Sequence, residues 1–197
     1  MQYKVSDGHG LPHDPFKSLV APRPIGWIST VDKQGRYSLA PYSFFNIVSA
    51  DPHMVMFCSE RKKDSVLNIE ETGEFVCSLA SYPQREAMVA CSAALAHGES
   101  EFEYAGLEMA SSSVVAPPRV KGSPAALECR YVRTIDMDSL DTAASHFMVI
   151  GQVVAIYIDD KVIREGQVDT KQLQYMARGG YFDYFVADQP FPMNRPS

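Results

Sequence analysis

The chain has 197 residues, a formal net charge of −6 and a pI near 5.3. Its 46% hydrophobic content suits a folded soluble protein with one sizeable core, so we expect a single domain over residues 1–197. The acidic balance argues against nucleic-acid or anionic-membrane binding, and no segment approaches the roughly 20 apolar residues that span a bilayer. Four scattered cysteines without a CxxC pair are typical of reduced thiols in a cytoplasmic protein.

The N-terminal region is expected to start irregularly and then form a hairpin. Residues 1–22 are predicted to be an irregular lead-in, because prolines interrupt any regular structure there. The apolar run over 25–31 predicts a strand. A tight reversal at 32–35 leads into a second strand over 36–45, so the two strands should pair as an antiparallel hairpin.

The next segment predicts a strand, a helix and a strand in succession. The apolar residues over 54–58 follow an Asp-Pro turn and form the first strand. Residues 65–72 have helical spacing, and Gly73 is well placed to stop that helix. Residues 75–79 then form a second short strand.

The C-terminal half is expected to contain one helix and two longer strands. Alanines and other apolar residues at helical spacing predict a helix over 83–95, and residues 96–118 are expected to be mostly loop. Alternation over 127–133 and the Val/Ile-rich run over 146–158 predict strands, and a proline-rich tail occupies 188–197. Many short strands with few helices favour an antiparallel barrel over a βαβ fold.

The segment Cys58–Ser65 is the first candidate for a binding site. Three consecutive cations, Arg61–Lys63, stand between Ser59 at a strand end and Asp64, a residue that can cap the following helix. Free helix N–H groups, the positive end of the helix dipole, hydroxyls and cations together suit a phosphate group. The alternative interpretation is a solvated basic loop.

Two further segments could hold a flat ligand. One ends in the hydroxyl pair Ser29-Thr30, and the other is the aromatic run Ala40–Asn46. Pro41 keeps part of the second segment's backbone out of sheet pairing, which leaves polar groups beside an apolar surface. The alternative is structural: Trp27 and Phe44 could simply be core residues, and the hydroxyl pair could start a turn.

Several catalytic motifs are missing from the sequence. It contains no GxGxxG, GxxxxGK[ST] or GxSxG pattern, so a dinucleotide fold, a P-loop and a hydrolase elbow are unsupported. The five histidines form no HxH or HExxH pair, and His97 with Glu99 is the nearest approach to metal-ligand spacing. No metal site is predicted.

The combined motifs resemble the flavin reductase-like, flavoredoxin-type family. The blocks that carry the resemblance are RPIGWISTVD (23–32), LAPYSFFN (39–46) and RKKDSVLNIEETGEFV (61–76), with weaker similarity at 146–160 and 178–181. The resemblance implies a mainly β fold, an antiparallel Greek-key split β-barrel with a few short flanking helices. It also implies a homodimer that binds FMN near the subunit interface, with NAD(P)H as electron donor.

The same resemblance assigns the flavin-binding residues. Positions matching the phosphate loop are Ser59, Arg61, Lys63, Asp64 and Ser65, although which of the three consecutive cations touches phosphate stays open. Beside the ribityl chain and ring it places Ser29, Thr30, Ala40, Pro41, Tyr42, Ser43 and Phe44. His146 and Tyr181 match positions that bring a side chain to the flavin, whereas His146 taken alone would be a core or interface histidine.

The sequence leaves more than one function open. The first hypothesis is an FMN-dependent, flavin reductase-like oxidoreductase that passes hydride or electrons from NAD(P)H through FMN to flavin or another acceptor. The second is an FMN-holding electron carrier without direct nicotinamide turnover, and the third is a split-barrel binding module without flavin. Because flavin itself carries the redox chemistry, the first two need no acid–base dyad in the protein.

Overall fold

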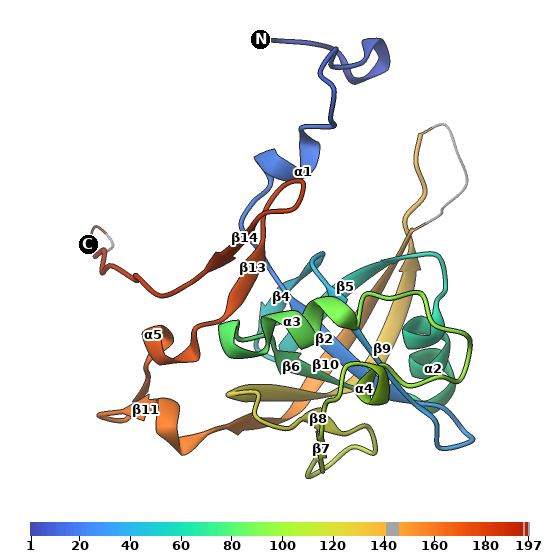
Figure 1. The fold of residues 1–197 in the computed structure, drawn as a ribbon, viewed down its shortest axis with the longest axis vertical. Helices are drawn as coiled ribbons and strands as arrows, with labels where there is room; N and C mark the ends of the chain where they lie inside the picture. The colour runs from blue at the N-terminus through green and yellow to red at the C-terminus, as the bar shows by residue number, and fades with distance from the viewer. Residues whose placement is uncertain (141–145, 195, 197) are drawn as a thin grey trace.

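A computed structural model describes residues 1–140, 146–194 and 196 of the chain. Its centre is an antiparallel sheet of seven strands in the order β3-β2-β6-β9-β10-β5-β4 (Figure 1). The strands are β2 (Gly26–Val31), β3 (Tyr37–Tyr42), β4 (Phe45–Ala50), β5 (His53–Glu60), β6 (Glu74–Leu79), β9 (Ala125–Asp136) and β10 (His146–Ile158). The predicted antiparallel barrel with a few short helices is confirmed.

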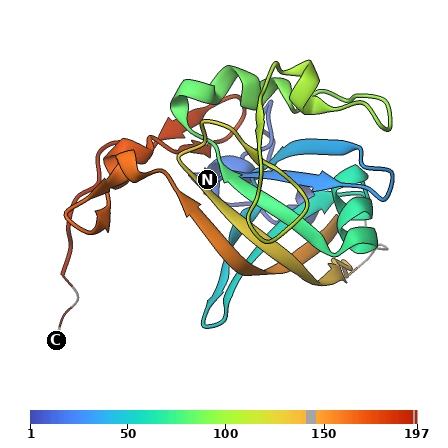
Figure 2. The same cartoon turned by 90° about the horizontal axis from the view of Figure 1, so that it is seen from below.

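The sheet closes because its two outer strands are neighbours in the chain. Only Ser43 and Phe44 separate β3 from β4, so the two edge strands of the sheet are joined at this corner, and Figure 2 shows how strongly the sheet curves. The Phe44 carbonyl accepts a hydrogen bond of 2.8 Å from the Cys58 amide of β5, which fixes this corner. The single strand expected over 36–45 is therefore wrong, since the chain changes sheet edge at this bend.

Helix α2 (Asp64–Thr72) packs into the barrel interior. Its Val66 and Ile69 are fully buried in the same cluster as Phe57 and Phe75 from the strands. Gly73 ends the helix in the left-handed conformation, with a φ of 78°, and its amide donates to the Ile69 carbonyl, as predicted. The helix that follows the basic loop is thus anchored by apolar contacts on its inner face.

A second apolar cluster lies under α3 (Arg85–Ala90) and α4 (Glu101–Tyr104). Trp27 and Leu39 from the barrel strands are fully buried there against Met88 and Phe102. The helix expected over 83–95 ends early, because i→i+3 hydrogen bonds such as Ser92 to Val89 tighten its last turn. A 3₁₀ turn, η2 (Tyr82–Gln84), precedes it.

The other elements are short. Within the expected loop 96–118 lie α4 and β7 (Met109–Ala110), which pairs with β8 (Arg119–Val120). Beyond β10 come η3 (Asp160–Val162), the hairpin β11 (Ile163–Arg164) and β12 (Gln167–Val168), and α5 (Thr170–Leu173), none of which the sequence predicted. Strand β9 is longer than the expected 127–133, whereas β10 has the predicted bounds.

Strands from the first and the last part of the chain pair beside the barrel. Two short helices, η1 (Val5–Asp7) and α1 (Phe16–Leu19), interrupt the expected irregular lead-in, which then runs into β1 (Arg23–Pro24). Strand β1 pairs with β13 (Met176–Arg178), and β13 pairs with β14 (Tyr184–Val186). Figure 1 shows the N-terminal segment rising from this small sheet, next to the turn between β13 and β14. The expected tail has no regular structure over 188–194, and residues 195 and 197 lie outside the described residues.

None of the helices in the described residues is long and apolar enough to cross a membrane. The longest is α2, with nine residues, well short of the roughly 20 that a membrane-spanning helix requires. All four cysteines are free thiols, and three of them, Cys77, Cys91 and Cys129, are buried.

A buried carboxylate holds one loop against the barrel. Glu128 of β9 is only 3% exposed, and its two oxygens accept hydrogen bonds of 2.7 to 3.3 Å from the amides of Ser113, Val114 and Val115. The Ser113 hydroxyl adds a fourth bond at 2.8 Å. Burial alone would raise the pKa of this carboxyl, but the four donors outweigh it and lower the pKa below the ordinary value.

Replacing Glu128 with Gln should therefore destabilise the fold. The amide group would face N–H donors, leaving at least one buried donor unpaired at a cost of about 1 to 3 kcal/mol. Urea unfolding at neutral pH measures this, with Glu103→Gln on the exposed part of α4 as control. The pKa of Glu128 is lower in the folded protein than in the unfolded chain. The difference in the free energy of unfolding between wild type and Glu128→Gln should therefore be largest above the pKa of the unfolded chain, and it should shrink as the pH falls through the pKa of the folded protein. A pH-independent difference would contradict this account.

Candidate functional site

The loop between β5 and α2 has a constrained backbone. Arg61 adopts the left-handed region with a φ of 65°, which is uncommon for a residue with a side chain. Its carbonyl accepts a 3.0 Å bond from the Ser59 hydroxyl and a 3.1 Å bond from the Lys63 amide. These two bonds hold the reversal that brings the chain from the end of β5 to the start of α2.

The three consecutive cations of this loop differ in their surroundings. Lys62 Nζ lies 2.9 Å from both carboxylate oxygens of Glu70 and 5.4 Å from the ring centroid of Phe147. The hydrogen bond to Glu70 raises the pKa of Lys62. Among the described residues, Arg61 and Lys63 form no ion pair. The loop therefore keeps two cations available for an anion and uses the third to brace itself.

The first turn of α2 leaves donors unused. Lys63 occupies the N-cap position, and no carbonyl of the described residues accepts a bond from the amides of Asp64 and Ser65. The expectation that Asp64 caps the helix is wrong, because its carboxylate turns outward and lies 3.0 Å from Nδ1 of His97. The other ring nitrogen of His97 lies 3.1 Å from the guanidinium of Arg36.

A cavity of about 480 Å³ opens beside this helix end and is referred to as the helix cavity. Six of the residues predicted from the sequence line it, namely Ala40, Pro41, Tyr42, Lys63, Asp64 and Ser65. The segment 91–97 forms the opposite wall, and His97 ties that wall to Asp64. The lining thus combines Lys63 and the Ser65 hydroxyl with the carboxylates of Asp64 and Glu101, and small apolar side chains lie along the 91–97 segment.

A larger cavity of about 800 Å³ adjoins the first and is referred to as the aromatic cavity. The two share Pro41, Tyr42 and Lys63. The aromatic cavity is also lined by four other predicted residues, Ser43, Phe44, His146 and Tyr181. Residues that are far apart in the sequence are therefore gathered around two joined spaces, at the corner where β3 passes into β4.

Tyr42 separates the two cavities from the barrel interior. Its ring packs 4.5 Å from that of Phe57, measured between centroids, and its side chain is almost fully buried. Burial raises the pKa of Tyr42, with the nearby hydroxyls of Ser65 and Ser59 acting in the opposite direction. Neither hydroxyl reaches hydrogen-bonding geometry, so the buried Tyr42 hydroxyl has no partner among the described residues.

Four predicted residues do not line either cavity. Ser29 and Thr30 are fully buried, and each has its hydroxyl engaged, Ser29 with the Pro118 carbonyl and Thr30 with Asn68 of α2. Ser59 bonds to the loop backbone, and the exposed Arg61 side chain lies outside the cavity walls. Thr30 and Ser59 thus support the helix and the loop from behind, whereas Ser29 ties its strand to the segment that ends at Pro118.

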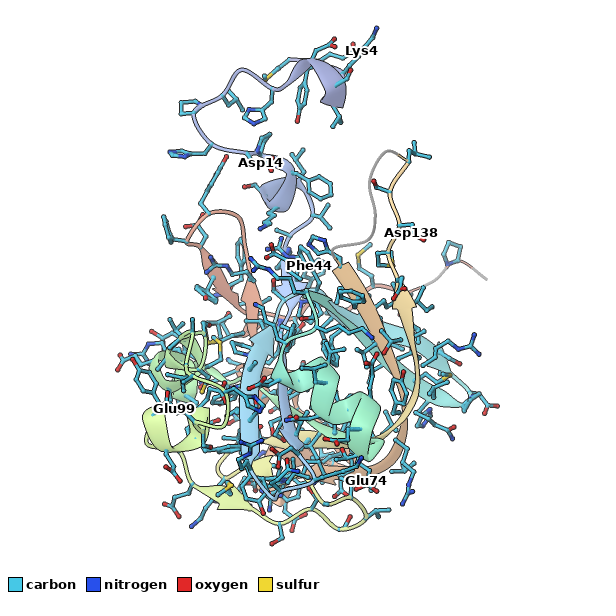
Figure 3. The ribbon with its side chains drawn as sticks, turned by 90° about the vertical axis from the view of Figure 1, so that its right-hand side faces the viewer. Lys4, Asp14, Phe44, Glu74, Glu99 and Asp138 are labelled. Atoms are coloured by element: carbon cyan, nitrogen blue, oxygen red, sulfur yellow. The ribbon has the colours of Figure 1, made fainter. Side chains whose placement is uncertain are left out.

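The N-terminal segment forms a wall of the aromatic cavity that the sequence did not predict. Figure 3 shows Asp14 above Phe44, on the segment that rises from this end of the barrel. His13 packs edge-on against Tyr181, with 5.8 Å between ring centroids. Gly180 lies so close to Ser18 that a Cβ atom there would come within 1.8 Å of the hydroxyl oxygen.

Arg23 joins this segment to the rest of the site. It is 8% exposed, and its guanidinium donates to the carbonyls of Lys17, of Val20 at 2.6 Å and of Gly179 at 2.7 Å. Arg23 lines the aromatic cavity, as does Arg178. Arg23 and Arg178 each begin a block that carries the family resemblance, 23–32 and 178–181. The residues around each arginine do not, however, predict that the two side chains lie together.

Comparison with known proteins identifies relatives of the whole domain. Residues 19–182 match the family model described as flavin reductase like domain. An uncharacterised protein of Halalkalibacterium halodurans is 33% identical over 183 residues, covering 90% of this chain and 88% of its own.

Two solved structures are similar over nearly the full length. Nitrilotriacetate monooxygenase component B from Bacillus cereus superposes with a TM-score of 0.88 and 28% identity, covering 98% of each chain. The 2-nitrobenzoate 2-nitroreductase of Pseudomonas fluorescens also gives 0.88, with 26% identity over 100% of this chain and 97% of its own. The superposed part takes in nearly the whole chain, and for the nitroreductase all of it, so it includes the residues that line both cavities and the loop between β5 and α2.

Proposed function

The chain belongs to the flavin reductase-like family, and from this premise we propose that it is an FMN-dependent oxidoreductase. The observation that supports FMN most directly is the helix end described above. The unpaired Lys63, two unused amides and the Ser65 hydroxyl meet beside a cavity that joins a larger aromatic one, and the unpaired Arg61 stands two residues before Lys63 in the same loop. A dianionic phosphate at one end of a flat heteroaromatic molecule fits this combination.

We place the FMN phosphate at the N-terminus of α2. The amides of Asp64 and Ser65 would donate to it, with Lys63 and Arg61 supplying charge. Lys62 is held by Glu70, so it contributes by fixing the loop. Thr30 and Ser59 would act from behind, through their contacts with the helix and the loop, and Ser29 would steady its strand through Pro118.

The flavin ring is assigned to the aromatic cavity. Pro41, Ser43 and Phe44 offer an apolar wall with exposed backbone at the strand corner, and His146 and Tyr181 stand at the other side. At about 800 Å³ the cavity has the size of a small-molecule site and leaves room for a second reactant beside the ring. When bound, FMN would supply hydride and electron transfer, while the protein orients it and excludes water.

The electron donor proposed is NAD(P)H, with free flavin or another small molecule as acceptor. The second candidate is an electron carrier that holds FMN without direct nicotinamide turnover, and the third is a binding module without flavin. The matches to a monooxygenase component and a nitroreductase, whose names denote enzymes, favour the first.

The first prediction from the proposed function concerns the basic loop. Arg61→Ala and Lys63→Ala should each weaken FMN binding roughly 10- to 100-fold, since each removes a charged partner of the phosphate. Fluorescence titration with FMN measures this, and Lys33→Ala is the matched control, expected to have a much smaller effect because Lys33 is an exposed lysine outside the loop. If both first variants bind FMN as tightly as wild type, the phosphate assignment is wrong.

The second prediction separates enzyme from carrier. Rapid anaerobic mixing of the FMN-loaded protein with NADH or NADPH should bleach the flavin absorbance within the time of a catalytic turnover. A flavin that stays oxidised with both nucleotides, yet is reduced by a partner protein, would favour the carrier. A preparation that remains colourless after FMN is added would rule out both.

The third prediction concerns a homodimer with FMN near the subunit interface. Large apolar side chains are exposed around the aromatic cavity and on the terminal segments, notably Phe182 at 90%, Leu19 at 75% and Phe16 at 62%. Exposed apolar side chains gathered beside a site mark an interaction surface, which a second copy could cover. Light scattering should give twice the 21.8 kDa chain mass, and a flavin-loaded monomer would contradict the interface site.

A further inference from the structure

Two arginines stand opposite each other at one side of the aromatic cavity. In the antiparallel pair of β1 and β13, Arg23 is the direct partner of Arg178. Directly opposite residues of such a pair project from the same face, and like charges in these positions are destabilising. Both arginines line the aromatic cavity, so an uncompensated pair of positive charges borders that space.

Arg23 is buried and has an unused donor. Three carbonyls accept bonds from its terminal nitrogens, but its Nε has no partner among the described residues. Burial lowers the pKa of Arg23, and the positive charge of Arg178 lowers it further. Carbonyl groups brace this guanidinium without neutralising it, since a carbonyl carries no net charge.

Contacts with two tyrosines fix the Arg178 side chain at the wall of the aromatic cavity. Its guanidinium carbon lies 4.3 Å from the ring centroid of Tyr184, and one terminal nitrogen donates to the Tyr181 carbonyl. The side chain is half-buried, and its remaining donors have no hydrogen-bond acceptor in the described part of the chain. A stacked guanidinium with free donors is pre-organised to bind two oxygens of a carboxylate or phosphate group in a bidentate fashion.

The rest of the lining adds to this positive charge. Lys17 and Lys63 also line the aromatic cavity, against two carboxylates, those of Asp14 and Glu60. Neither carboxylate is within ion-pair distance of any of the four cations, as far as the described residues go. The excess of cations stands out in a chain whose net charge is −6.

We propose that the Arg23–Arg178 pair, with Lys17 at its rim, binds the oxyanion group of the second reactant that meets the flavin. The chemistry that this subsite recognises is a carboxylate or phosphate group attached to a planar, aromatic molecule, since aromatic side chains such as Phe44 and Tyr181 line the same cavity. Identifying the ligand as a reactant rests on the proposed function, whereas the oxyanion subsite itself stands on the arginine geometry. The subsite is separate from the FMN phosphate position at α2.

The test uses two small anions as probes. Benzoate represents an aromatic carboxylate, and inorganic pyrophosphate represents the diphosphate of a dinucleotide. Each is titrated into the full-length protein at constant ionic strength, with and without saturating FMN. Calorimetry gives the dissociation constant, and the visible spectrum of bound FMN reports whether the anion lies beside the ring.

Wild type should bind at least one of the anions saturably, and the better of the two shows which source of oxyanion the subsite favours. Arg178→Gln should weaken that binding about tenfold or more, and Lys17→Gln should weaken it less. The matched control is Arg164→Gln, which removes one arginine from the exposed strand β11 and should bind as wild type does. Arg23 is left unchanged because its carbonyl contacts hold the N-terminal segment.

The FMN affinity of each variant is measured in parallel, so the two proposals can fail separately. FMN binding without saturable anion binding, or an Arg178→Gln variant that binds both anions like wild type, overturns the oxyanion subsite. If Arg178→Gln loses FMN as well as the anion, the pair belongs to the flavin site and the separate subsite is wrong. Anion binding that depends on Arg178 in a protein unable to bind FMN supports the subsite and overturns the proposed function.

Discussion

The whole site depends on the closure of the barrel at Ser43 and Phe44. Because β3 and β4 are consecutive in the chain but lie at opposite edges of the sheet, the two residues between them must turn a sharp corner. All four residues from Pro41 to Phe44 line the aromatic cavity, and Pro41 and Tyr42 line the helix cavity as well, so the two cavities meet at this corner. The basic loop and α2 are then brought to the same corner by β5, which bonds directly to it.

Local sequence signals were sufficient for the parts of the site that are contiguous. The basic loop, the helix with its Gly73 stop and most barrel strands follow from hydrophobic period and turn chemistry within short windows. The sequence-based predictions were wrong where contacts between distant segments determine the local structure. The 36–45 segment has an unbroken strand-like pattern, and only sheet closure breaks it at Ser43. Likewise, Asp64 is a good cap by residue type, but His97 from a distant loop draws its carboxylate away.

The arginine pair could not be foreseen for the same reason. Arg23 and Gly179 are separated by 156 residues, and neither the period nor the composition around either one predicts a contact. The resemblance pointed to the neighbouring residues, yet it named Tyr181 and not Arg178. A motif predicts which segments approach a ligand. The net charge around a cavity depends on residues from several distant segments, so it can be read only from the folded structure.

The close fit between Ser18 and Gly180 has a consequence for protein synthesis. The N-terminal segment packs against residues that the ribosome adds much later. Arg23 donates to the carbonyl of Gly179, and Ser18 lies against Gly180, where a side chain would not fit. Translating the 156 intervening residues takes roughly 8 to 30 seconds at ordinary ribosomal speeds. Throughout that interval the segment lacks the Gly179 carbonyl and the surface of Gly180, so it can take its final place only after β13 and the turn beyond it have been synthesised.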